Sequence, residues 1–329
     1  MSVLQLDNLR TSLLLDGVER HAVREISFSI GEGETLAIVG ESGCGKSMLA
    51  MSIMRLLPSV AAITEGRILL DSEAIEAEPE TRMEQIRGAR IGMVFQEPMT
   101  ALNPVLTVGE QIAEPLRDHL KLTRREARKA AIALMEKVRI PSAASRYNSF
   151  PHEFSGGMRQ RVVIALAIAC RPRLLIADEP TTALDVTVQR QILDLLDLLR
   201  TEGRMGMLLI THNLGIVAGH ADRVAVMYGG DLVESATVRE LFANAAHPYS
   251  RALLASLPRV DRDLSELASI PGRVPTLANM PDGCRFIDRC PHAMEACRAM
   301  PPAVRLESAG EHMVRCWLHV AGGDDAAHG

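Results

Sequence analysis

The chain has 329 residues, 47% of them hydrophobic, and its formal net charge is −5. That length exceeds what one compact core usually occupies, so we expect two or three structural units. The small negative charge disfavours nucleic acid as the main partner, because binding to a phosphate backbone needs a concentrated basic face.

No segment of the sequence is expected to cross a membrane. The longest wholly apolar run, residues 162–170, is less than half of the roughly 20 residues that span a bilayer. Residues 1–7 lack the basic and then apolar layout of a secretory signal. We therefore expect a cytoplasmic location, where the six cysteines would serve as thiols or metal ligands rather than as disulfides.

Short apolar runs that end in turn or polar residues predict the strands of the core. The first run, residues 35–39, ends at Gly40, and helix-forming residues continue after it as far as Leu57. Further strands are predicted at residues 91–95, 174–177, 207–210 and 224–227. Parallel strands that alternate with helices imply an α/β fold.

Residues 97–170 have a helical pattern throughout and are expected to form a helical subdomain inserted into the core. Thr123 and Glu126 have the spacing of a capping box, which satisfies the first backbone N–H groups of a helix. We expect this helix to run through Val138 and to stop at Pro141.

A long amphipathic helix is predicted after Asp185, with its end at Gly203. Past residue 247 the sequence changes to prolines, short helical pieces and four of the six cysteines. We therefore divide the chain into a first domain, 1–246, and a C-terminal extension, 247–329. The apolar face of the long helix consists of Val188, Ile192, Leu195, Leu196 and Leu199.

Residues 40–47 match the phosphate-binding P-loop, and they lie between a predicted strand and a predicted helix, as the motif requires. Glycines let successive backbone N–H groups turn toward phosphates, and the helix N-terminus adds a partial positive charge. Lys46 is expected to reach the β- and γ-phosphates, and the Ser47 hydroxyl is expected to bind Mg²⁺. The loop consists of Gly40, Glu41, Ser42, Gly43, Cys44, Gly45, Lys46 and Ser47.

Two acids follow the predicted strand 174–177 at the edge where open α/β sheets bind ligands. Asp178 is expected to hold Mg²⁺ through its water shell, and Glu179 is expected to act as general base on a water in line with the γ-phosphorus. His212 follows another strand and is placed to contact the γ-phosphate. Gln96, after a third strand, is expected to sense Mg²⁺ and the attacking water.

A second glycine-rich helix start, Ser155-Gly156-Gly157, has no strand before it and no lysine after it. The serine and the backbone N–H groups can form an anion site at the start of a helix that runs toward Cys170. This site has no nucleotide of its own, so it is usable only if another subunit brings a nucleotide to it.

The order and spacing of these motifs resemble those of ABC-transporter ATPases over residues 3–246. The motifs are the P-loop, the glutamine loop of Gln96, the Ser-Gly-Gly signature, the Asp-Glu pair, the loop of Ala183, Leu184 and Asp185, and the switch His212. The resemblance implies that two subunits close head to tail around two ATP molecules, each between one P-loop and the other subunit's signature. It also implies that Asp185 communicates across the dimer interface and that residues 96–104 lie against a permease. The expected fold is an α/β P-loop ATPase core with an N-terminal antiparallel β subdomain, an inserted helical subdomain and a cysteine-bearing C-terminal extension.

Residues 96–104, Met158, residues 247–249 and residues 271–317 resemble the dipeptide, oligopeptide and nickel importer branch. This implies an active ATP-hydrolysing subunit at the cytoplasmic face of a bacterial inner membrane. Its partners would be a second, different ATPase, two permease subunits and an extracytoplasmic binding protein. Peptide is the expected cargo, with a nickel chelate, glutathione or an oligosaccharide as alternatives, because the cargo contacts other subunits.

Two other classes of protein are disfavoured by the motifs. A non-transport ABC ATPase that acts on DNA or the ribosome would carry a long coiled-coil insertion or two cassettes, and the sequence has neither. A P-loop kinase has no use for the Ser-Gly-Gly signature. Many ABC ATPases stack an aromatic residue on adenine, but residues 10–22 contain no Phe, Tyr or Trp, which leaves His21, Leu14 or Leu15 as candidates.

Four cysteines of the extension form a candidate ligand set: Cys284, Cys290, Cys297 and Cys316. Four thiolates suit either tetrahedral zinc or a cubane iron–sulfur cluster. The resemblance favours a [4Fe–4S] cluster, because some members of the importer branch carry one on this tail. Zinc, with or without His312, and free buried thiols are the alternatives.

Overall fold

The computed structural model describes residues 2–182, 184–257, 270–306 and 311–320. The chain divides into two compact units, each built from segments that are distant in the sequence. The first unit combines residues 1–5, 29–35 and 68–210. The second unit combines residues 6–28, 36–67 and 211–329.

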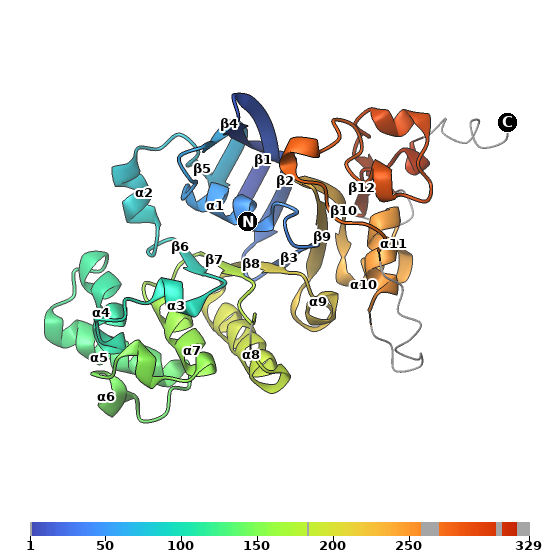
Figure 1. Cartoon of the computed structure of the whole chain (residues 1–329). Coiled ribbons are helices and arrows are strands. Elements are labelled where there is room, and N and C mark those ends of the chain that lie inside the picture. The colour runs from blue at the N-terminus through green and yellow to red at the C-terminus, as the bar shows by residue number, and fades with distance from the viewer. Residues whose placement is uncertain (1, 183, 258–269, 307–310, 321–329) are drawn as a thin grey trace. The chain divides into compact units, whose positions relative to one another are not determined.

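Parallel strands form the core of the first unit (Figure 1). β7 (Leu174–Asp178) pairs in parallel with β6 (Ile91–Val94) on one side and with β8 (Gly206–Thr211) on the other. Every residue of β7 is buried, as expected for a strand that is covered on both faces. The predicted strands 91–95, 174–177 and 207–210 are confirmed to within one residue at each end.

The predicted amphipathic helix is α8 (Val186–Gly203). Its left-handed cap is Arg204, with φ of 50°, and Gly203 is the last helical residue rather than the cap. The helix therefore ends at Gly203, as predicted, and a single non-glycine residue can adopt the cap conformation at modest cost. The buried face of the helix holds Ile192, Leu193, Leu195, Leu196 and Leu199.

The helical subdomain follows β6 and is drawn in green and teal in Figure 1. Thr123 and Glu126 form the predicted capping box, in which Glu126 Oε2 accepts the Thr123 backbone N–H at 2.9 Å. The last helix of the subdomain starts at Gly156 and runs toward Cys170, as expected, and it ends at Ala167, three residues before that cysteine. Its helices are α3 (Pro98–Ala101), α4 (Val108–Asp118), α5 (Arg124–Lys137), α6 (Ala143–Arg146) and α7 (Gly156–Ala167), with a 3₁₀ turn, η1 (Pro151–Glu153). Two smaller elements, β5 (Glu73–Ala74) and α2 (Glu80–Ile86), precede β6.

The second unit contains a mixed sheet. β3 (Thr35–Val39) pairs in parallel with β9 (Arg223–Tyr228), and β10 (Asp231–Thr237) runs antiparallel to β9. β12 (Met313–Val314) pairs with β10 and in turn with β11 (Val304–Arg305). The C-terminal extension therefore contributes strands to the same sheet that carries the P-loop strand β3.

The helix after the P-loop is shorter than predicted. α1 (Lys46–Met54) ends before Leu57 because Arg55 adopts a left-handed conformation with φ of 52°. The three rings of Tyr228, Tyr249 and Phe286 are fully or almost fully buried and pack on one another in the core. The other helices of this unit are α9 (Leu214–His220), α10 (Val238–Asn244), α11 (Pro248–Ala255) and the 3₁₀ turns η3 (Leu277–Asn279), η4 (Ile287–Arg289), η5 (Glu295–Arg298) and η6 (Trp317–His319).

The predicted N-terminal β subdomain is present. β1 (Ser2–Leu15) and β2 (Val18–Gly31) form a hairpin whose two-residue turn, Asp16 and Gly17, has φ of 50° and 77°. Two positive φ values in a two-residue hairpin turn match the right-handed twist of the strands. β4 (Ala61–Leu70) lies next to β1 in the sheet.

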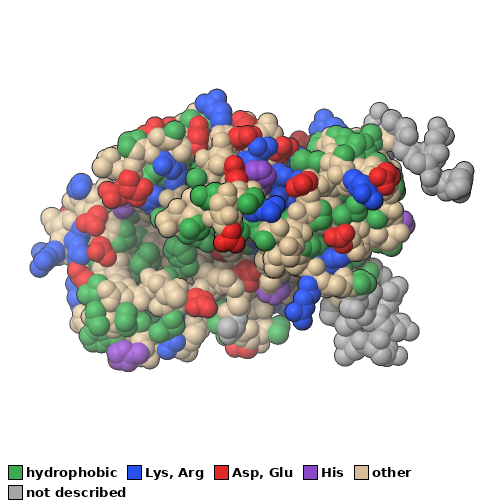
Figure 2. All heavy atoms as spheres, turned by 45° about the horizontal axis from the view of Figure 1, so that its top comes forward, with side chains coloured by type: hydrophobic (Ala, Val, Ile, Leu, Met, Phe, Trp, Pro, Cys, Tyr) green, Lys and Arg blue, Asp and Glu red, His purple; other side chains and the backbone are tan. Residues whose placement is uncertain are grey.

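Acidic and basic side chains are interspersed on the face drawn in Figure 2. Within the first unit, Arg82 pairs with Glu73 at 2.8 Å; within the second, Arg10 pairs with Glu25 at 2.9 Å. Such exposed pairs contribute at most about 1 kcal/mol each to stability. In the part of the chain that the structure describes, no helix has the length and apolarity needed to cross a bilayer.

A buried carboxylate holds the start of α11. Glu234 accepts the backbone N–H groups of Ala246 at 2.7 Å and of His247 at 2.9 Å, and its Oε1 lies 2.7 Å from Nε2 of His312. The Nδ1 atom of His247 caps the helix by accepting the backbone N–H of Tyr249 at 3.0 Å. His312, considered above as a zinc ligand, is thus engaged by Glu234.

Acidification is expected to destabilise this region through His247. Burial, and after it the charges of His319 and Arg251, lower the pKa of His247 to about 3. The unfolded chain takes up a proton near pH 6.5 and the folded chain does not, so stability falls as the pH drops below that value. The expected loss at pH 5.5 is about 1.4 kcal/mol from this residue.

The measurement is urea unfolding at pH 7.5 and 5.5, followed by the fluorescence of Trp317, the single tryptophan of the chain. His247→Asn is the matched variant, because asparagine can still cap the helix but does not titrate. We expect the wild type to lose about 1.4 kcal/mol more than this variant between the two pH values. Equal losses would show that His247 is not the titrating group.

Candidate functional site

The glycines of the P-loop lie where a side chain would strain the backbone or clash with neighbouring atoms. Gly43 and Gly45 have φ of 79° and 102°, in the left-handed region that other residues rarely adopt. A Cβ atom on Gly40 would lie 2.2 Å from the carbonyl oxygen of Met227 in β9. A loop packed this closely against the neighbouring strand has a defined path, as a phosphate cradle needs.

Lys46 is buried at the start of α1, with its ammonium group turned back onto the loop. Its Nζ donates to the carbonyl oxygens of Gly40 at 2.8 Å and of Glu41 at 3.0 Å. Ser47 is the next residue of the helix and is half-buried. The predicted cation and hydroxyl therefore both lie at the helix N-terminus, where a polyphosphate is favoured.

Cys44 is a structural residue of the loop rather than a reactive thiol. Burial raises the pKa of its thiol, and the nearby Lys46 opposes that shift. Its carbonyl oxygen accepts the backbone N–H of Gly230 at 2.8 Å. A neutral, buried thiol is a poor nucleophile, so the residue contributes packing.

The strand that carries His21 runs beside the P-loop. A Cβ atom on Gly45 would lie 2.6 Å from the carbonyl oxygen of Ala22, the next residue after His21. The His21 Nδ1 atom lies 2.9 Å from the Ser12 hydroxyl, and burial followed by the charge of Arg10 lowers its pKa. Leu14 is exposed and Leu15 is half-buried in the same hairpin. His21, Leu14 and Leu15 therefore all remain candidates for the contact with adenine.

In the first unit, Gln96 and Glu179 come together. Glu179 follows the buried Asp178 at the end of β7 and has a left-handed backbone, with φ of 46°. Its Oε2 atom accepts Nε2 of Gln96 at 3.3 Å and Oγ1 of Thr182 at 3.0 Å. Two donors on one oxygen orient the carboxylate.

Thr182 was not identified from the sequence. A threonine three residues after an acid is common, and its only sequence signal is a position within hydrogen-bonding reach of Glu179 across the turn. His212 is the residue after β8, belongs to the second unit and is exposed. It precedes Asn213, whose side chain caps α9 by accepting the backbone N–H of Gly215 at 2.9 Å.

The Ser-Gly-Gly signature and Asp185 lie together in the first unit. Ser155 is the exposed N-cap of α7 and accepts the backbone N–H of Met158 at 3.4 Å. Asp185 is the exposed N-cap of α8 and accepts the backbone N–H of Val188 at 2.9 Å. Both helix starts line one hollow of about 380 Å³. Of the loop predicted to surround Asp185, Ala183 lies outside the described residues.

Gly157 allows the two helix starts to approach. A Cβ atom on it would lie 2.6 Å from a methyl group of Val188. The hollow is also lined by Arg161, whose guanidinium is fixed by the carbonyl oxygen of Val138 at 2.9 Å and by Gln191 at 3.2 Å. The arrangement leaves two helix N-termini facing an open, polar hollow, which suits a partner that carries negative charge.

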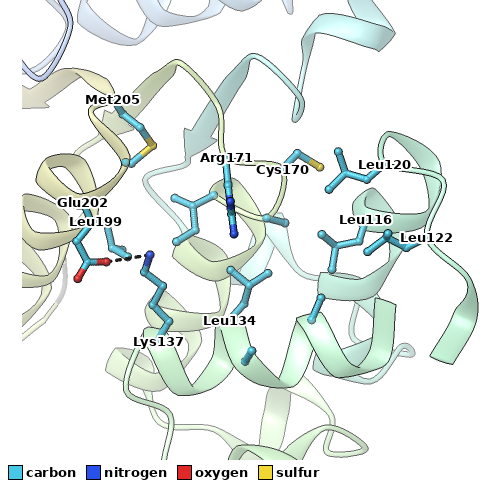
Figure 3. Close-up of a pocket in the computed structure, with 15 residues that line it drawn as sticks. Leu116, Leu120, Leu122, Leu134, Lys137, Cys170, Arg171, Leu199, Glu202 and Met205 are labelled. Carbon is cyan, nitrogen blue, oxygen red and sulfur yellow. Dashed lines mark ion pairs between the residues drawn. The ribbon is translucent and has the colours of Figure 1, made fainter. Parts of the chain in front are cut away.

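A larger hollow of about 710 Å³ in the first unit is apolar and separate from these motifs (Figure 3). Leu116, Leu120 and Leu134 line it, and Lys137 pairs with Glu202 at 2.9 Å on one side. Cys170 also lines it, and burial raises the pKa of this thiol to about 11. None of the residues predicted to bind ATP lines this hollow.

The four cysteines of the extension are gathered in the second unit. Burial, opposed by a hydrogen bond from the Phe286 backbone N–H and assisted by the three neighbouring cysteines, raises the pKa of Cys284 to about 12. The Cys284 backbone N–H donates to the Cys297 carbonyl oxygen at 2.9 Å. All four are free thiols.

Gly283 allows the backbone at Cys284 to lie close to that at Cys297 and Arg298. Backbone N–H groups also donate to three of the cysteine sulfurs. A Cβ atom on Gly283 would lie 2.3 Å from the carbonyl oxygen of Arg298. The Cys290 and Cys316 sulfurs each accept a backbone N–H two residues later, as Cys284 does. Among the residues that the structure describes, no group of three or more His, Cys, Asp or Glu side chains is arranged to hold a metal ion, so this arrangement supports neither zinc nor an iron–sulfur cluster.

Comparison with protein families gives two matches along the chain. The model described as ABC transporter matches residues 23–182, and the model described as oligopeptide/dipeptide transporter, C-terminal region, matches residues 233–297. Together these matches include the P-loop, the signature, the Asp-Glu pair and three of the four clustered cysteines.

Curated relatives are similar over nearly the whole chain. A protein of Brucella abortus named as a putative peptide import ATP-binding protein is 51% identical over 97% of this chain and 98% of its own length. The dipeptide transport ATP-binding protein DppD of Bacillus subtilis is 49% identical over 96% of this chain and 94% of its own. The oligopeptide transport ATP-binding protein OppD of Salmonella typhimurium is 46% identical over 91% and 89%.

Solved structures support the same fold. An ATP-binding cassette determined as a dimer in a post-hydrolysis state with ADP and phosphate has a TM-score of 0.65. It is 28% identical, and the match covers 72% of this chain and 99% of that one. The uncovered share of this chain is of the size expected for its C-terminal extension.

Proposed function

Because this chain belongs to the ATP-binding proteins of ABC transporters, in the branch of the peptide importers, we propose that it hydrolyses ATP to power peptide uptake across a bacterial inner membrane. The observation that carries this proposal is the similarity to peptide-import subunits over nearly the whole chain, the C-terminal region included. The similarity supports the peptide class; no residue described here selects peptide length.

The geometry supports a separate role for each of the nucleotide-binding residues. The P-loop would cradle the phosphates, with Lys46 next to the β- and γ-phosphates. Glu179, oriented by Gln96 and Thr182, would take the proton of the attacking water. His212, after β8, would contact the γ-phosphate.

The donor set fits Mg²⁺, which prefers hard oxygen ligands and keeps several waters. Ser47 offers a hydroxyl, the buried Asp178 a carboxylate and Gln96 an amide oxygen. When bound there, Mg²⁺ would neutralise negative charge that develops on the phosphates during hydrolysis.

The signature is proposed to act on the nucleotide of a second ATPase subunit. Ser155 and the N–H groups of Gly156 and Gly157 lie at an exposed helix start that has no lysine of its own. Asp185 at the same hollow would communicate across that interface. The partner would be a second, different ATPase, which supports a heterodimer as the working unit.

The segment after Gln96 suits contact with a permease. Phe95, Met99, Val105 and Leu106 are large apolar side chains that are exposed in the first unit. An apolar cluster beside the catalytic glutamine offers a surface that another protein would bury. We therefore propose that this segment docks on one of two transmembrane permease subunits, with an extracytoplasmic binding protein delivering the cargo. The chain would then lie peripherally at the cytoplasmic face of the membrane.

Purification of the tagged protein from native membranes in mild detergent tests this assembly. Two permease subunits and a second ATPase are expected to co-purify. Recovery of ribosomal or DNA-associated proteins alone would overturn the transport proposal while leaving the ATPase chemistry intact.

We also propose that the four clustered cysteines hold a [4Fe–4S] cluster. Three of the four sulfurs accept a backbone N–H from two residues later, and such hydrogen bonds stabilise thiolate ligands of iron–sulfur centres. Burial raises the pKa of the Cys284, Cys290 and Cys316 thiols, so their thiolates are costly to form without a metal, and a cluster would stabilise them.

Protein purified without oxygen is expected to be brown, with about four iron and four sulfide per chain. Cys290→Ser is expected to lose most of the iron, because one ligand is removed. Cys170→Ser is the matched control, since this buried cysteine lies in the other unit and should leave the iron content unchanged. Colourless protein with zinc or with no metal would contradict the cluster.

A further inference from the structure

All three polar groups of Glu41, the first residue after Gly40 in the P-loop, are held in place. Its backbone N–H donates to the hydroxyl of Tyr249 at 2.9 Å. Its carbonyl oxygen accepts Nζ of Lys46 at 3.0 Å. Its two carboxylate oxygens accept the guanidinium of Arg289 at 2.7 and 3.1 Å. Two of these three partners, Tyr249 and Arg289, come from the C-terminal extension.

The side chain of Arg289 is also held in place by contacts other than the pair with Glu41. Its side chain is 5% exposed, and Nε donates to the carbonyl oxygen of Pro271 at 2.7 Å. Nη1 also lies 3.3 Å from the Tyr228 hydroxyl, and the guanidinium lies over the Tyr228 and Phe286 rings. A bidentate guanidinium–carboxylate pair fixes the orientation of both side chains as well as neutralising their charges. The other contacts of Arg289 leave its side chain little freedom to move.

Tyr249 presents its hydroxyl from a rigid support. The ring is fully buried and meets the Tyr228 ring edge-on at 4.7 Å between centroids and the Phe286 ring at 5.3 Å. Burial raises the pKa of Tyr249, so its phenol is neutral at physiological pH. Both contacts to Glu41 thus rest on one aromatic core, to which β9 and the extension contribute.

We propose that Arg289 and Tyr249 are positioning residues for ATP binding, through which the C-terminal extension fixes the P-loop and neutralises Glu41. This inference rests on the proposed function, because it requires that the loop bind ATP. Lys46 is bonded to the Glu41 carbonyl, so displacement of Glu41 would displace the ammonium. Loss of Arg289 would also leave an uncompensated carboxylate within a loop that has to accept a highly anionic ligand.

The test compares the dissociation constants for ATP and AMP, measured by calorimetry on the full chain. Arg289→Gln is expected to weaken ATP binding about tenfold, and AMP binding much less, because the repulsion acts on the phosphates. Glu41→Gln in the Arg289→Gln background is expected to recover most of the lost affinity. Arg289→Lys is expected to lie between the wild type and Arg289→Gln, since lysine keeps the charge but not the fork.

Two controls separate this role from a folding defect. Arg298→Gln removes an exposed arginine of the same extension and should leave the ATP affinity unchanged. Tyr249→Phe keeps the ring and removes only the hydroxyl that accepts the Glu41 N–H, and a several-fold loss of ATP affinity is expected. This variant tests the proposal even if Arg289→Gln does not fold.

Unchanged ATP affinity in Arg289→Gln or in Tyr249→Phe would overturn the proposal. So would a double variant as weak as Arg289→Gln, or an equal loss for ATP and AMP, because the charge of Glu41 would then be irrelevant. Failure of the wild type to bind ATP at all would be a different result, since it would reject the proposed function itself.

Discussion

Replacing Glu179 by glutamine is expected to lower ATP turnover by about 10²- to 10⁴-fold and to leave ATP binding intact. Glutamine has nearly the same shape as glutamate, and its carbonyl oxygen can still accept the bonds from Gln96 and Thr182. It cannot, however, take a proton from the attacking water. Phosphate release and the dissociation constant for ATP measure the two effects separately.

The matched control is Glu202→Gln in the same unit. Glu202 pairs with Lys137 at 2.9 Å on the surface, and its loss should change turnover by less than about twofold. Near-normal turnover in Glu179→Gln would reject Glu179 as the general base. A loss of ATP binding in that variant would instead point to a structural role for the carboxylate.

The second large effect is expected from Gly40→Ala, which should abolish ATP binding. The new Cβ would meet the Met227 carbonyl oxygen at 2.2 Å and the Cys44 sulfur at 2.8 Å. A backbone oxygen in a paired strand has nowhere to move, so the loop would have to shift. We expect a stability cost of about 3 kcal/mol, at the upper end of the range for overpacking.

Gly219→Ala is the matched control for this substitution. Gly219 lies in α9 of the same unit, and a Cβ atom on it would meet nothing within 4 Å. Alanine there should leave ATP binding unchanged and raise stability by about 0.5–1 kcal/mol. Calorimetric titration with ATP and thermal unfolding measure both variants. If Gly40→Ala binds ATP normally, the close packing of the loop is not required for binding.

The fold could be predicted largely because its signals are local. Short apolar runs marked the strands of the core, and the capping box at Thr123 marked a helix start. Helix ends were less predictable. α1, for example, ends earlier than predicted because Arg55 adopts a left-handed conformation, and an arginine does not differ in type from helical residues.

Candidate site residues could be proposed from the sequence where they follow one another in the chain, as in the P-loop and the Asp-Glu pair. Gln96 and Glu179 are 83 residues apart, and their contact depends on the pairing of β6 with β7. Arg289 and Glu41 are 248 residues apart, and neither residue type suggests the other. No local pattern encodes such a pair, because it arises only when the extension folds onto the second unit's sheet.

The C-terminal extension is therefore a structural part of the unit that carries the P-loop. It supplies strands to the P-loop sheet, the buried capping residue of α11, four clustered cysteines and two contacts to Glu41. The cysteine Cys290 directly follows Arg289 in the chain. A structural change at Cys290 would therefore occur one residue away from Arg289, which contacts Glu41 of the P-loop.

The most direct test of the central claim is peptide uptake by cells that lack this subunit and are complemented with either the wild type or Glu179→Gln. Radiolabelled di- and oligopeptides are supplied, and accumulation is measured with and without depletion of ATP. ATP-dependent uptake is expected with the wild type and almost none with Glu179→Gln. Equal uptake with both, or restored uptake of nickel but not of peptides, would contradict it.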